Sequence, residues 1–381
     1  MKNTDISERG LESLIISDLT GMLDRSDPSG KATREISFPY DGAGYIPGDP
    51  QGYDREHAID LVKLLSFLQE TQPQAFTRLG LGEDGPRRRE FLARLQGEIA
   101  KRGVIDVLRK GVQHKAASVS LFYGAPSPGN LLAQQHFAAN AFSVTRQLRY
   151  SPDQTKLALD LCLFINGLPV ITFELKNSLT KQTYDDAIWQ YRQDRDPKEL
   201  LFQFGRCMVH FAVDDGQVHM CTHLTGKDSW FLPFNKGWND GAGNPPNPHG
   251  LMTEYLWKEV LTRQGLAEII ENYAQVVEEK DPRTGKKRKK QIFLTHEPPF
   301  RAKIDKVDHG PAKGKHVGNF GITWAIKKYK PLLHFCGHIH ESQGVSRIGK
   351  TLCINAGYGR NGQAVIVELE NKKTKIKFVK H

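Results

Sequence analysis

An aspartate, a glutamate and a lysine mark two apolar runs in residues 157–176, LALDLCLFINGLPVITFELK. Asp160 lies in the first run, and Glu174 and Lys176 end the second run, two residues apart. Residues two apart project from the same face of a β-strand. Two carboxylates can bind Mg²⁺, and a neighbouring ammonium can assist an attacking water and the charge that develops on a phosphate. The pattern Asp-(x)n-Glu-x-Lys therefore predicts a site that hydrolyses phosphodiesters.

A β-hairpin must position these groups. Asn166-Gly167 separates the two apolar runs and is a strong signal for a two-residue turn. Such a turn alone would place Asp160 opposite Phe173, so that Asp160 and Glu174 would project from opposite faces. We therefore expect an odd-numbered loop or a β-bulge in this hairpin. The alternative is an ordinary buried hairpin with charged residues at its ends.

The elements around the hairpin indicate an α/β core with a mixed sheet. Apolar residues at helical spacing predict a helix over residues 7–19, and alternation predicts a strand over 142–150 beside the hairpin. A second helix follows Lys176 and ends before Pro197. Glu12 lies on the first helix, and we interpret it as a solvated surface carboxylate rather than as a group directed toward the site.

Composition indicates a globular chain with two different parts. The 381 residues are enough for two domains, and the net charge is +10. Residues 294–381 hold 16 Lys and Arg against 6 Asp and Glu, which accounts for the whole excess. There is no signal-peptide layout, no apolar run long enough to span a membrane, and no C-x-x-C pair among the five cysteines. We therefore expect a cytoplasmic protein without a membrane partner.

Five consecutive basic residues interrupt the middle of the chain. They are Lys286, Lys287, Arg288, Lys289 and Lys290. Such a run is typical of a segment that binds a nucleic-acid backbone. It is equally typical of an exposed basic linker, and the sequence leaves both interpretations open.

The first three quarters of the chain resemble the N-terminal part of the R subunit of type I restriction–modification enzymes. The stretches that resemble it are SERGLESLI, GYDREHAIDLVKLLSFLQETQP, DLCLFINGLPVITFELKNS, QFGRCMVHFAVDD, TEYLWKEVL and DPRTGKKRKKQIF. This resemblance implies a PD-(D/E)-x-K fold that cuts DNA with Mg²⁺, with Asp160, Glu174 and Lys176 as its catalytic residues. It also implies a Gln-x-x-x-Tyr motif, of which Gln190 would be the glutamine, although Asp194 stands at the tyrosine position.

In that family an ATP-driven translocase follows the nuclease, and methyltransferase and specificity subunits complete the complex. Here the family pattern stops near Phe293, so we expect no motor in this chain. GVSRIGKT at 344–351 has Walker A spacing, but the strand-like TLCINAG follows it where a P-loop needs a helix. We therefore expect no ATP site. The predicted division is a nuclease domain over 1–255, a helical and basic linker over 256–293, and a separate segment over 294–381.

The last segment resembles the C-terminal third of calcineurin-like metallophosphoesterases. The resemblance rests on THEPP and GHIH, which imply His296, His338 and His340 as metal ligands. A two-metal centre also needs carboxylates to bridge and balance its cations. The family's upstream aspartate motifs are absent, so we interpret the segment as half of a site within a partial α/β domain.

The favoured interpretation is a magnesium-dependent DNA endonuclease domain of the type I restriction class, joined to a partial metallophosphoesterase. Two alternatives remain open at this stage. One is a catalytically silent module that binds DNA or docks onto the other subunits. The other is a metal-dependent phosphoesterase that acts through the three C-terminal histidines.

Overall fold

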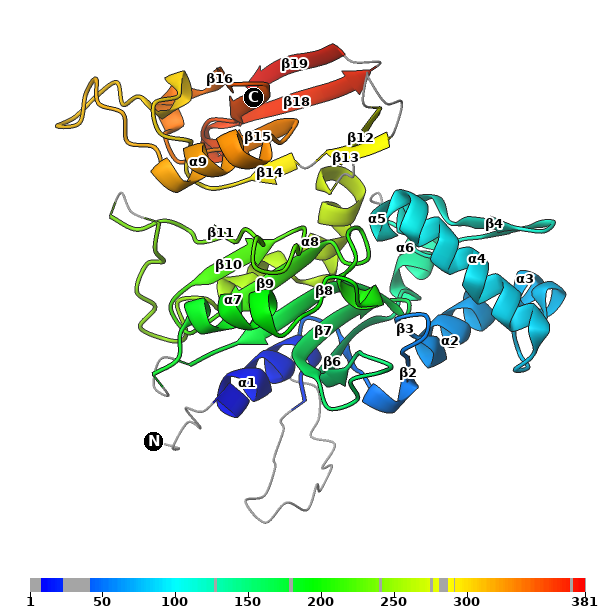
Figure 1. Cartoon of the computed structure of the whole chain (residues 1–381). Coiled ribbons are helices and arrows are strands. Elements are labelled where there is room, and N and C mark those ends of the chain that lie inside the picture. The colour runs from blue at the N-terminus through cyan, green and yellow to red at the C-terminus, as the bar shows by residue number, and fades with distance from the viewer. Residues whose placement is uncertain are drawn as a thin grey trace. The chain divides into compact units, whose positions relative to one another are not determined.

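The computed structural model describes residues 8–22, 42–126, 129–177, 181–239, 242–274, 277–280, 287–290, 292–370 and 373–380. The chain divides into two compact units (Figure 1). Unit 1 comprises residues 1–231 and 246–275, and unit 2 comprises residues 232–245 and 276–381. The predicted hairpin lies in unit 1, and the three C-terminal histidines lie in unit 2.

A mixed β-sheet forms the centre of unit 1, as the sequence predicts. Its strands run in the order β1-β6-β7-β8-β9-β10, with β1–β6 and β8–β9 parallel and the other pairs antiparallel. The bounds are β1 Ile46–Pro47, β6 Phe142–Arg149, β7 Ala158–Ile165, β8 Leu168–Leu175, β9 Val209–Val213 and β10 Val218–Cys221.

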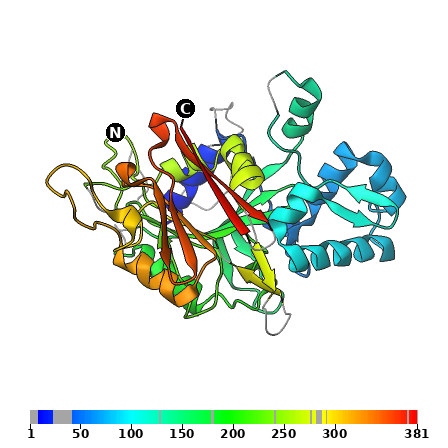
Figure 2. The same cartoon turned by 90° about the horizontal axis from the view of Figure 1, so that it is seen from above.

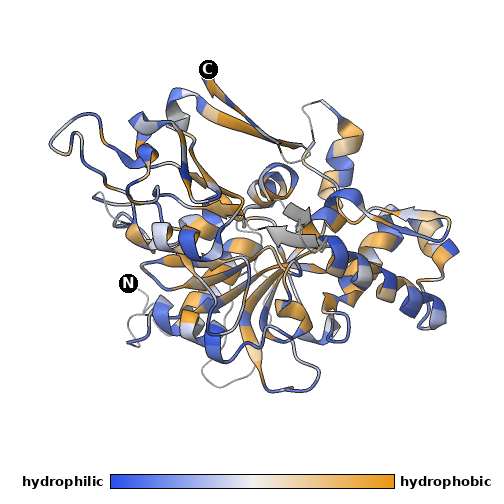
Figure 3. Ribbon diagram, turned by 45° about the horizontal axis from the view of Figure 1, so that its top comes forward, coloured by the Kyte–Doolittle hydropathy of each residue, from blue (hydrophilic) through white to orange (hydrophobic). Residues whose placement is uncertain are grey.

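The hairpin strands β7 and β8 are the most deeply buried part of this sheet. Every residue of β8 is buried. A strand covered on both faces reads as a continuous apolar run, which is why its sequence shows little alternation. Figure 3 shows that the central strands are mostly hydrophobic, while the helices around them carry both hydrophobic and hydrophilic residues.

Two helices flank the sheet of unit 1 (Figure 1). Helix α7 (Tyr184–Gln193) packs on β8 and β9, while α1 (Glu8–Thr20) contacts β1, β6 and β8. A capping box starts α7, because Thr183 and Asp186 bond to each other's backbone N–H groups. The predicted helices at both places are confirmed.

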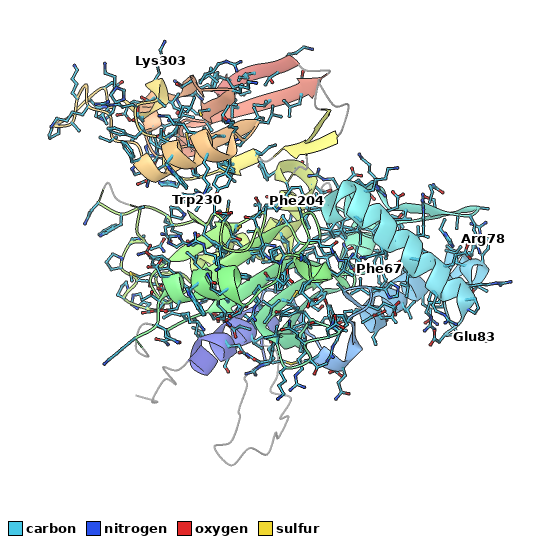
Figure 4. All side chains as sticks on the ribbon, in the orientation of Figure 1. Phe67, Arg78, Glu83, Phe204, Trp230 and Lys303 are labelled. Carbon is cyan, nitrogen blue, oxygen red and sulfur yellow. The ribbon has the colours of Figure 1, made fainter. Side chains whose placement is uncertain are left out.

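A lobe of helices extends from one side of the sheet (Figures 1 and 2). Figure 4 places Arg78 and Glu83 at the far end of this lobe. Its hairpins and helices are β2 Tyr53–Asp54, β3 Ile59–Asp60, α2 Leu61–Thr71, α3 Pro73–Leu79, α4 Pro86–Arg102, α5 Val104–Lys110, β4 Val112–His114 and β5 Ala117–Val119, preceded by the 3₁₀ turn η1 Pro50–Gly52. Helix α6 (Leu131–Ala138) precedes β6, and a further 3₁₀ turn, η3 Leu200–Phe202, lies between α7 and β9.

Short helices near residue 260 close unit 1. They are the π-helical turn η4 Leu256–Val260, α8 Arg263–Glu268 and the π-helical turn η5 Ile269–Tyr273. Trp257 donates its indole N–H to Asp18 of α1 at 2.7 Å, and Tyr45 donates its hydroxyl to the Leu261 carbonyl at 2.8 Å. These bonds tie the segment to the N-terminal part of the same unit.

Unit 2 contains a smaller sheet with the order β14-β15-β17-β16. Buried Leu333, Leu352 and Ile354 form the centre of its apolar core. Its elements are β11 Leu232–Pro233, β12 Val277–Lys280, β13 Lys287–Lys290, β14 Ile292–Leu294, η6 Lys303–Asp305, α9 Phe320–Tyr329, β15 Leu333–Cys336, η7 His340–Ser342, β16 Gly344–Ile348, β17 Thr351–Asn355, η8 Gly359–Asn361, β18 Gln363–Glu370 and β19 Lys373–Lys380.

Among the described residues, no helix has the length and apolar character needed to cross a bilayer. The five cysteines are buried free thiols. Burial raises the pKa of the Cys207 thiol to about 12, so this thiol is un-ionised at neutral pH. These cysteines therefore serve as small apolar core residues.

Candidate active site

The β7–β8 hairpin has both a two-residue turn and a bulge. Asn166 and Gly167 have φ values of +49° and +80°, which is the backbone of a type I′ turn. The register shifts between Leu163 and Phe164, so that Val170 on β8 has no partner on β7. Beyond this bulge Leu161 faces Phe173. The bulge that the sequence predicts is therefore confirmed.

The bulge places Asp160 and Glu174 across from each other on neighbouring strands, because the register continues from the Leu161–Phe173 pair. Asp160 is half-buried, and its Oδ2 accepts a hydrogen bond from the Leu175 backbone N–H at 2.7 Å. Its Oδ1 lies 3.4 Å from the side-chain amide nitrogen of Gln147. The structure thus brings together the two carboxylates that the sequence singles out.

Glu174 is fully buried. Its Oε1 accepts a hydrogen bond from Arg195 Nε at 2.6 Å, and its Oε2 has no hydrogen-bond partner among the described residues. Burial raises the pKa of the Glu174 carboxyl and the nearby Asp160 adds to the rise, while Arg195 and Lys176 act in the opposite direction. A buried carboxylate oxygen without a partner costs free energy unless a cation or a proton satisfies it.

Lys176 directly follows β8 and is nearly buried, at 8% exposure. Its backbone N–H donates to the Val213 carbonyl of β9 at 2.9 Å, so the hydrogen bonding between β8 and β9 continues up to this residue. Its charge lowers the pKa of Glu174, which places the ammonium within electrostatic reach of that carboxylate. Asp160, Glu174 and Lys176 therefore form one electrostatic cluster.

Glu12 joins this cluster, and the interpretation of Glu12 as a solvated carboxylate is wrong. It is 3% exposed, and its two oxygens accept hydrogen bonds from Arg146 Nε at 2.5 Å and Gln147 Nε2 at 2.7 Å. Burial raises the pKa of Glu12, and the negative charge of Asp160 contributes to that rise. Ile15 and Leu19 lie three and seven residues after Glu12, so helical spacing had already placed it on the buried face of α1.

Helix α7 contributes to the site region through residues other than the predicted Gln190. Gln190 is half-buried on α7. The Tyr191 hydroxyl is instead hydrogen-bonded to Thr172 Oγ1 of β8 at 2.8 Å, and Thr172 in turn lies 2.7 Å from His210 Nδ1. Arg195, just past the end of α7, reaches Glu174. The role of Gln190 stays a prediction.

The basic run lies only in part within the described residues. Lys286 is outside them. Residues 287–290 form β13, which pairs antiparallel with β12. The backbone of Lys287, Arg288, Lys289 and Lys290 is therefore extended and paired in a hairpin, and their nucleic-acid contact stays a prediction.

The three C-terminal histidines are neighbours in unit 2. His338 Nδ1 lies 3.0 Å from His296 Nε2, and the exposed His340 stacks on Tyr358 with ring centroids 3.9 Å apart. Burial lowers the pKa of His296 to about 4, with further lowering by His338 and His340. Neutral imidazoles are the form that binds metals.

Carboxylates next to these histidines have protein partners in the described part of the chain. Glu297 accepts a hydrogen bond from Asn319 at 2.7 Å, and Asp305 is paired with His316 at 2.6 Å. Across all described residues, the ligand atoms of one group of three metal-ligating side chains converge within 4.8 Å, namely Asp308, His309 and Glu341. That group is distinct from the predicted histidines and includes two exposed side chains.

The Walker-like stretch forms a hairpin. Strand β16 (Gly344–Ile348) turns through Gly349, with φ of +59°, into the antiparallel strand β17 (Thr351–Asn355). A P-loop needs a helix in the place of β17, with its backbone N–H groups directed at phosphates. This segment therefore does not have the geometry of a nucleotide site.

Two family models match separate parts of the chain. Residues 84–229 match the model of the type I restriction enzyme R protein N terminus, and residues 275–379 match the model of metallophosphoesterases of the calcineurin superfamily. Two separate parts of the chain are therefore similar to domains of two enzyme families. Asp160, Glu174, Lys176 and Gln190 lie within the first match, and the three C-terminal histidines lie within the second.

Similarity to individual proteins covers short stretches. An uncharacterized protein of Methanocaldococcus jannaschii is 40% identical over 72 residues, which are 18% of this chain and 32% of that protein. The chain thus spans about a third of the length of that relative. The crystal structure of TT1561 of Thermus thermophilus is similar over 23% of this chain and 33% of its own, with 20% identity and a TM-score of 0.16. A second crystal structure is similar over 24% of this chain and 33% of its own, with 24% identity and a TM-score of 0.20.

Proposed function

We propose that unit 1 is a magnesium-dependent DNA endonuclease domain of the PD-(D/E)-x-K type, as in the R subunit of type I restriction enzymes. The main support is the bulged hairpin, which sets Asp160 across from Glu174 with Lys176 two residues further on. This hairpin lies inside the segment that matches the R-subunit N terminus.

The residues at this place fit a hard divalent cation. Glu174 offers a buried Oε2 that has no partner among the described residues, and Asp160 offers a half-buried carboxylate opposite it. Carboxylate oxygens are the ligands that Mg²⁺ prefers. A bound Mg²⁺ supplies Lewis-acid activation of the phosphate and of the attacking water.

The side chains around the cation would divide the remaining work. Asp160 and Glu174 would hold the cation, and their shared position on β7 and β8 would fix its place in the sheet. Lys176 would orient the water and stabilise negative charge on the phosphate, a contribution worth about a hundredfold in rate. Gln190 would position α7 or contact the DNA.

The same proposal covers the partners. DNA is the substrate, and Lys286, Lys287, Arg288, Lys289 and Lys290 would contact its backbone near the join at residue 293. Methyltransferase and specificity subunits would complete the complex in the cytoplasm, and the specificity subunit would supply sequence recognition. The division of the chain at residues 255 and 293 stays a prediction, and the two compact units divide at other positions, with residues 246–275 in unit 1 and residues 276–381 in unit 2.

Plasmid cleavage by the purified full chain tests this proposal, with Mg²⁺ and without ATP. Nicking or linearisation should fall by about a hundredfold or more in Glu174→Ala and Lys176→Ala, while DNA affinity measured by filter binding is retained. His338→Ala serves as the matched control in unit 2 and should cleave like the wild type.

The other outcomes select between the alternatives. A folded wild-type chain that binds DNA without cutting it would point to a silent DNA-binding or docking module. Cleavage lost in His338→Ala and kept in Glu174→Ala would assign hydrolysis to the metallophosphoesterase-like segment. Either result contradicts the proposal.

A further inference from the structure

We propose that Arg195 is a positioning residue of this site, which holds one oxygen of Glu174 so that the other oxygen is presented to the cation. This inference rests on the proposed nuclease function. It concerns a residue 21 positions after Glu174 in the sequence, beyond the end of α7.

Arg195 is itself buried, at 3% exposure, and its guanidinium contacts three different residues. Its Nε donates to Glu174 Oε1 at 2.6 Å, and its Nη2 donates to the Ala158 carbonyl at 2.8 Å. Its Nη1 lies 3.5 Å from the Tyr150 hydroxyl, and its Cζ lies 5.6 Å from the centre of the Tyr150 ring. A single planar group therefore connects β8, the start of β7 and the residue that follows β6.

This geometry gives the two oxygens of the Glu174 carboxylate different surroundings. Oε1 is occupied by Arg195, and Oε2 is buried without a partner among the described residues. A buried ion pair usually satisfies all of its lone pairs, because an unsatisfied carboxylate oxygen costs free energy. A cation ligand requires an oxygen that is free of other bonds, on a carboxylate across from a second carboxylate, as Glu174 is from Asp160. In a purely structural ion pair the same oxygen would only cost free energy.

Replacing Arg195 by lysine distinguishes the effect of the shape of the guanidinium from the effect of its charge. Its ammonium restores the positive charge beside Glu174, but it cannot reach Glu174, Ala158 and Tyr150 from one rigid plane. If Arg195 acts only as a counter-ion, Arg195→Lys should bind metal like the wild type. If it positions Glu174, Arg195→Lys should bind metal more weakly, even where the chain is folded.

The test is binding of Mn²⁺ to the full chain. The electron paramagnetic resonance signal of the free ion measures how much Mn²⁺ is bound. Wild type should bind Mn²⁺, and Glu174→Gln should abolish that binding. Arg195→Lys should weaken it by at least tenfold at a temperature where circular dichroism shows a folded chain. Tyr150→Phe, which removes the contact of the Tyr150 hydroxyl to Arg195 Nη1 and leaves the bond from Arg195 Nε to Glu174, should change it by less than twofold.

Two results would overturn the inference in different ways. Unchanged Mn²⁺ affinity in Arg195→Lys, with binding lost in Glu174→Gln, would support the metal site and show that Arg195 does not position Glu174. Mn²⁺ binding that is absent, or that persists in Glu174→Gln, would defeat the proposed function together with this inference.

A measurement on the wild type covers the case in which Arg195→Lys does not fold. The Nε–H resonance of Arg195 can be identified by its shift in Tyr150→Phe. It should remain visible and slow to exchange with water when Mg²⁺ is added, because the bond to Glu174 Oε1 persists in the loaded site. Its loss on addition of Mg²⁺ would show that the ion displaces Arg195, and the inference would be wrong.

Discussion

Gln147 donates a hydrogen bond from its side-chain amide to Glu12 at 2.7 Å, from a backbone position with φ of +47° inside β6. Positive φ is rare for a residue with a Cβ atom, and it costs about 1–2 kcal/mol. The kink coincides with a gap in the β6–β7 register, between the Arg146–Leu161 and Leu148–Leu159 pairs. A strained residue that reaches two carboxylates of the candidate site is consistent with a functional constraint.

Replacing Gln147 by glycine and by alanine should separate this strain from the lost hydrogen bond. Both variants lose the amide, but only glycine adopts positive φ freely. Gln147→Gly should therefore be more stable than Gln147→Ala by about 1 kcal/mol in urea unfolding. At the exposed Gln113 of β4 the order should reverse. Alanine as the better residue at both positions would contradict the strained backbone.

Asn166 should be the most sensitive residue of the hairpin turn. It is fully buried, donates to the Leu121 carbonyl and to Asn140 Oδ1 at 2.9 Å each, and accepts from the Ala141 N–H at 2.7 Å. Asn166→Ala leaves the Leu121 carbonyl, Asn140 Oδ1 and the Ala141 N–H without these hydrogen bonds. It should lower the free energy of unfolding by about 3 kcal/mol.

The matched comparison for Asn166 is Asn130, which caps α6 through one bond to the Ala133 N–H. Asn130→Ala should cost about 1 kcal/mol. Equal losses at the two asparagines in urea unfolding would show that the buried network around the turn does not stabilise the hairpin.

His210 should make the stability of unit 1 depend on pH. Burial, with a contribution from His223, lowers the pKa of His210 from 6.5 to about 3. The unfolded chain takes up a proton below pH 6.5 and the folded chain does not, so stability is lost as the pH falls from 6.5 toward 3. The expected slope from this one group is about 1.4 kcal/mol per pH unit.

His210→Asn removes this titration while keeping a polar group near Thr172. The stability difference between wild type and His210→Asn should therefore narrow as the pH falls from about 6.5 to about 4.5. Thermal unfolding at several pH values measures this difference. A constant difference across this pH range would show that His210 takes up its proton equally in the folded and the unfolded chain.

Asn355 should have the corresponding structural role in unit 2. It is fully buried, donates to the Ile339 carbonyl at 2.8 Å and accepts from the Gly357 N–H at 2.9 Å. In Asn355→Ala, amide hydrogen exchange in β17 should accelerate by at least about tenfold, the effect of a loss near 1.4 kcal/mol. The exposed Asn361→Ala is the control, and equal protection in both variants would contradict this role.

The sequence predicted the central part of the site because local patterns determine it. The Asn166-Gly167 turn and the two apolar runs fix the hairpin, and the positions of Asp160 and Glu174 then require a change of register. The bulge could thus be predicted from a conflict between turn length and chemistry. Its location at Val170 could not, because buried apolar residues of one strand look alike in sequence.

The second half of the site depends on packing between distant segments. Arg195 pairs with Glu174 only because α7 folds back onto β8, and no periodicity in the sequence joins these two residues. The burial of Glu12 does not follow from its residue type, because a charged residue on a helix is usually solvated. Its spacing from Ile15 and Leu19 was the available signal, and the partners that offset the cost of its burial come from β6, more than a hundred residues away.

The Val170 bulge has a consequence for how this gene can change. Loss of the codon for Val170 would leave a regular hairpin in which Leu163 still faces Ile171 and Asp160 still faces Glu174. Gain of one codon between Val170 and Glu174 would instead turn the side chains beyond that point of β8 to the other side of the sheet. Both faces of this strand are covered, so such a chain could still fold. A single in-frame insertion can therefore separate Asp160 from Glu174 without any substitution, whereas a deletion at the bulge keeps them paired. Related chains that have lost this carboxylate pair should then be found among insertions in the hairpin as well as among substitutions of Glu174.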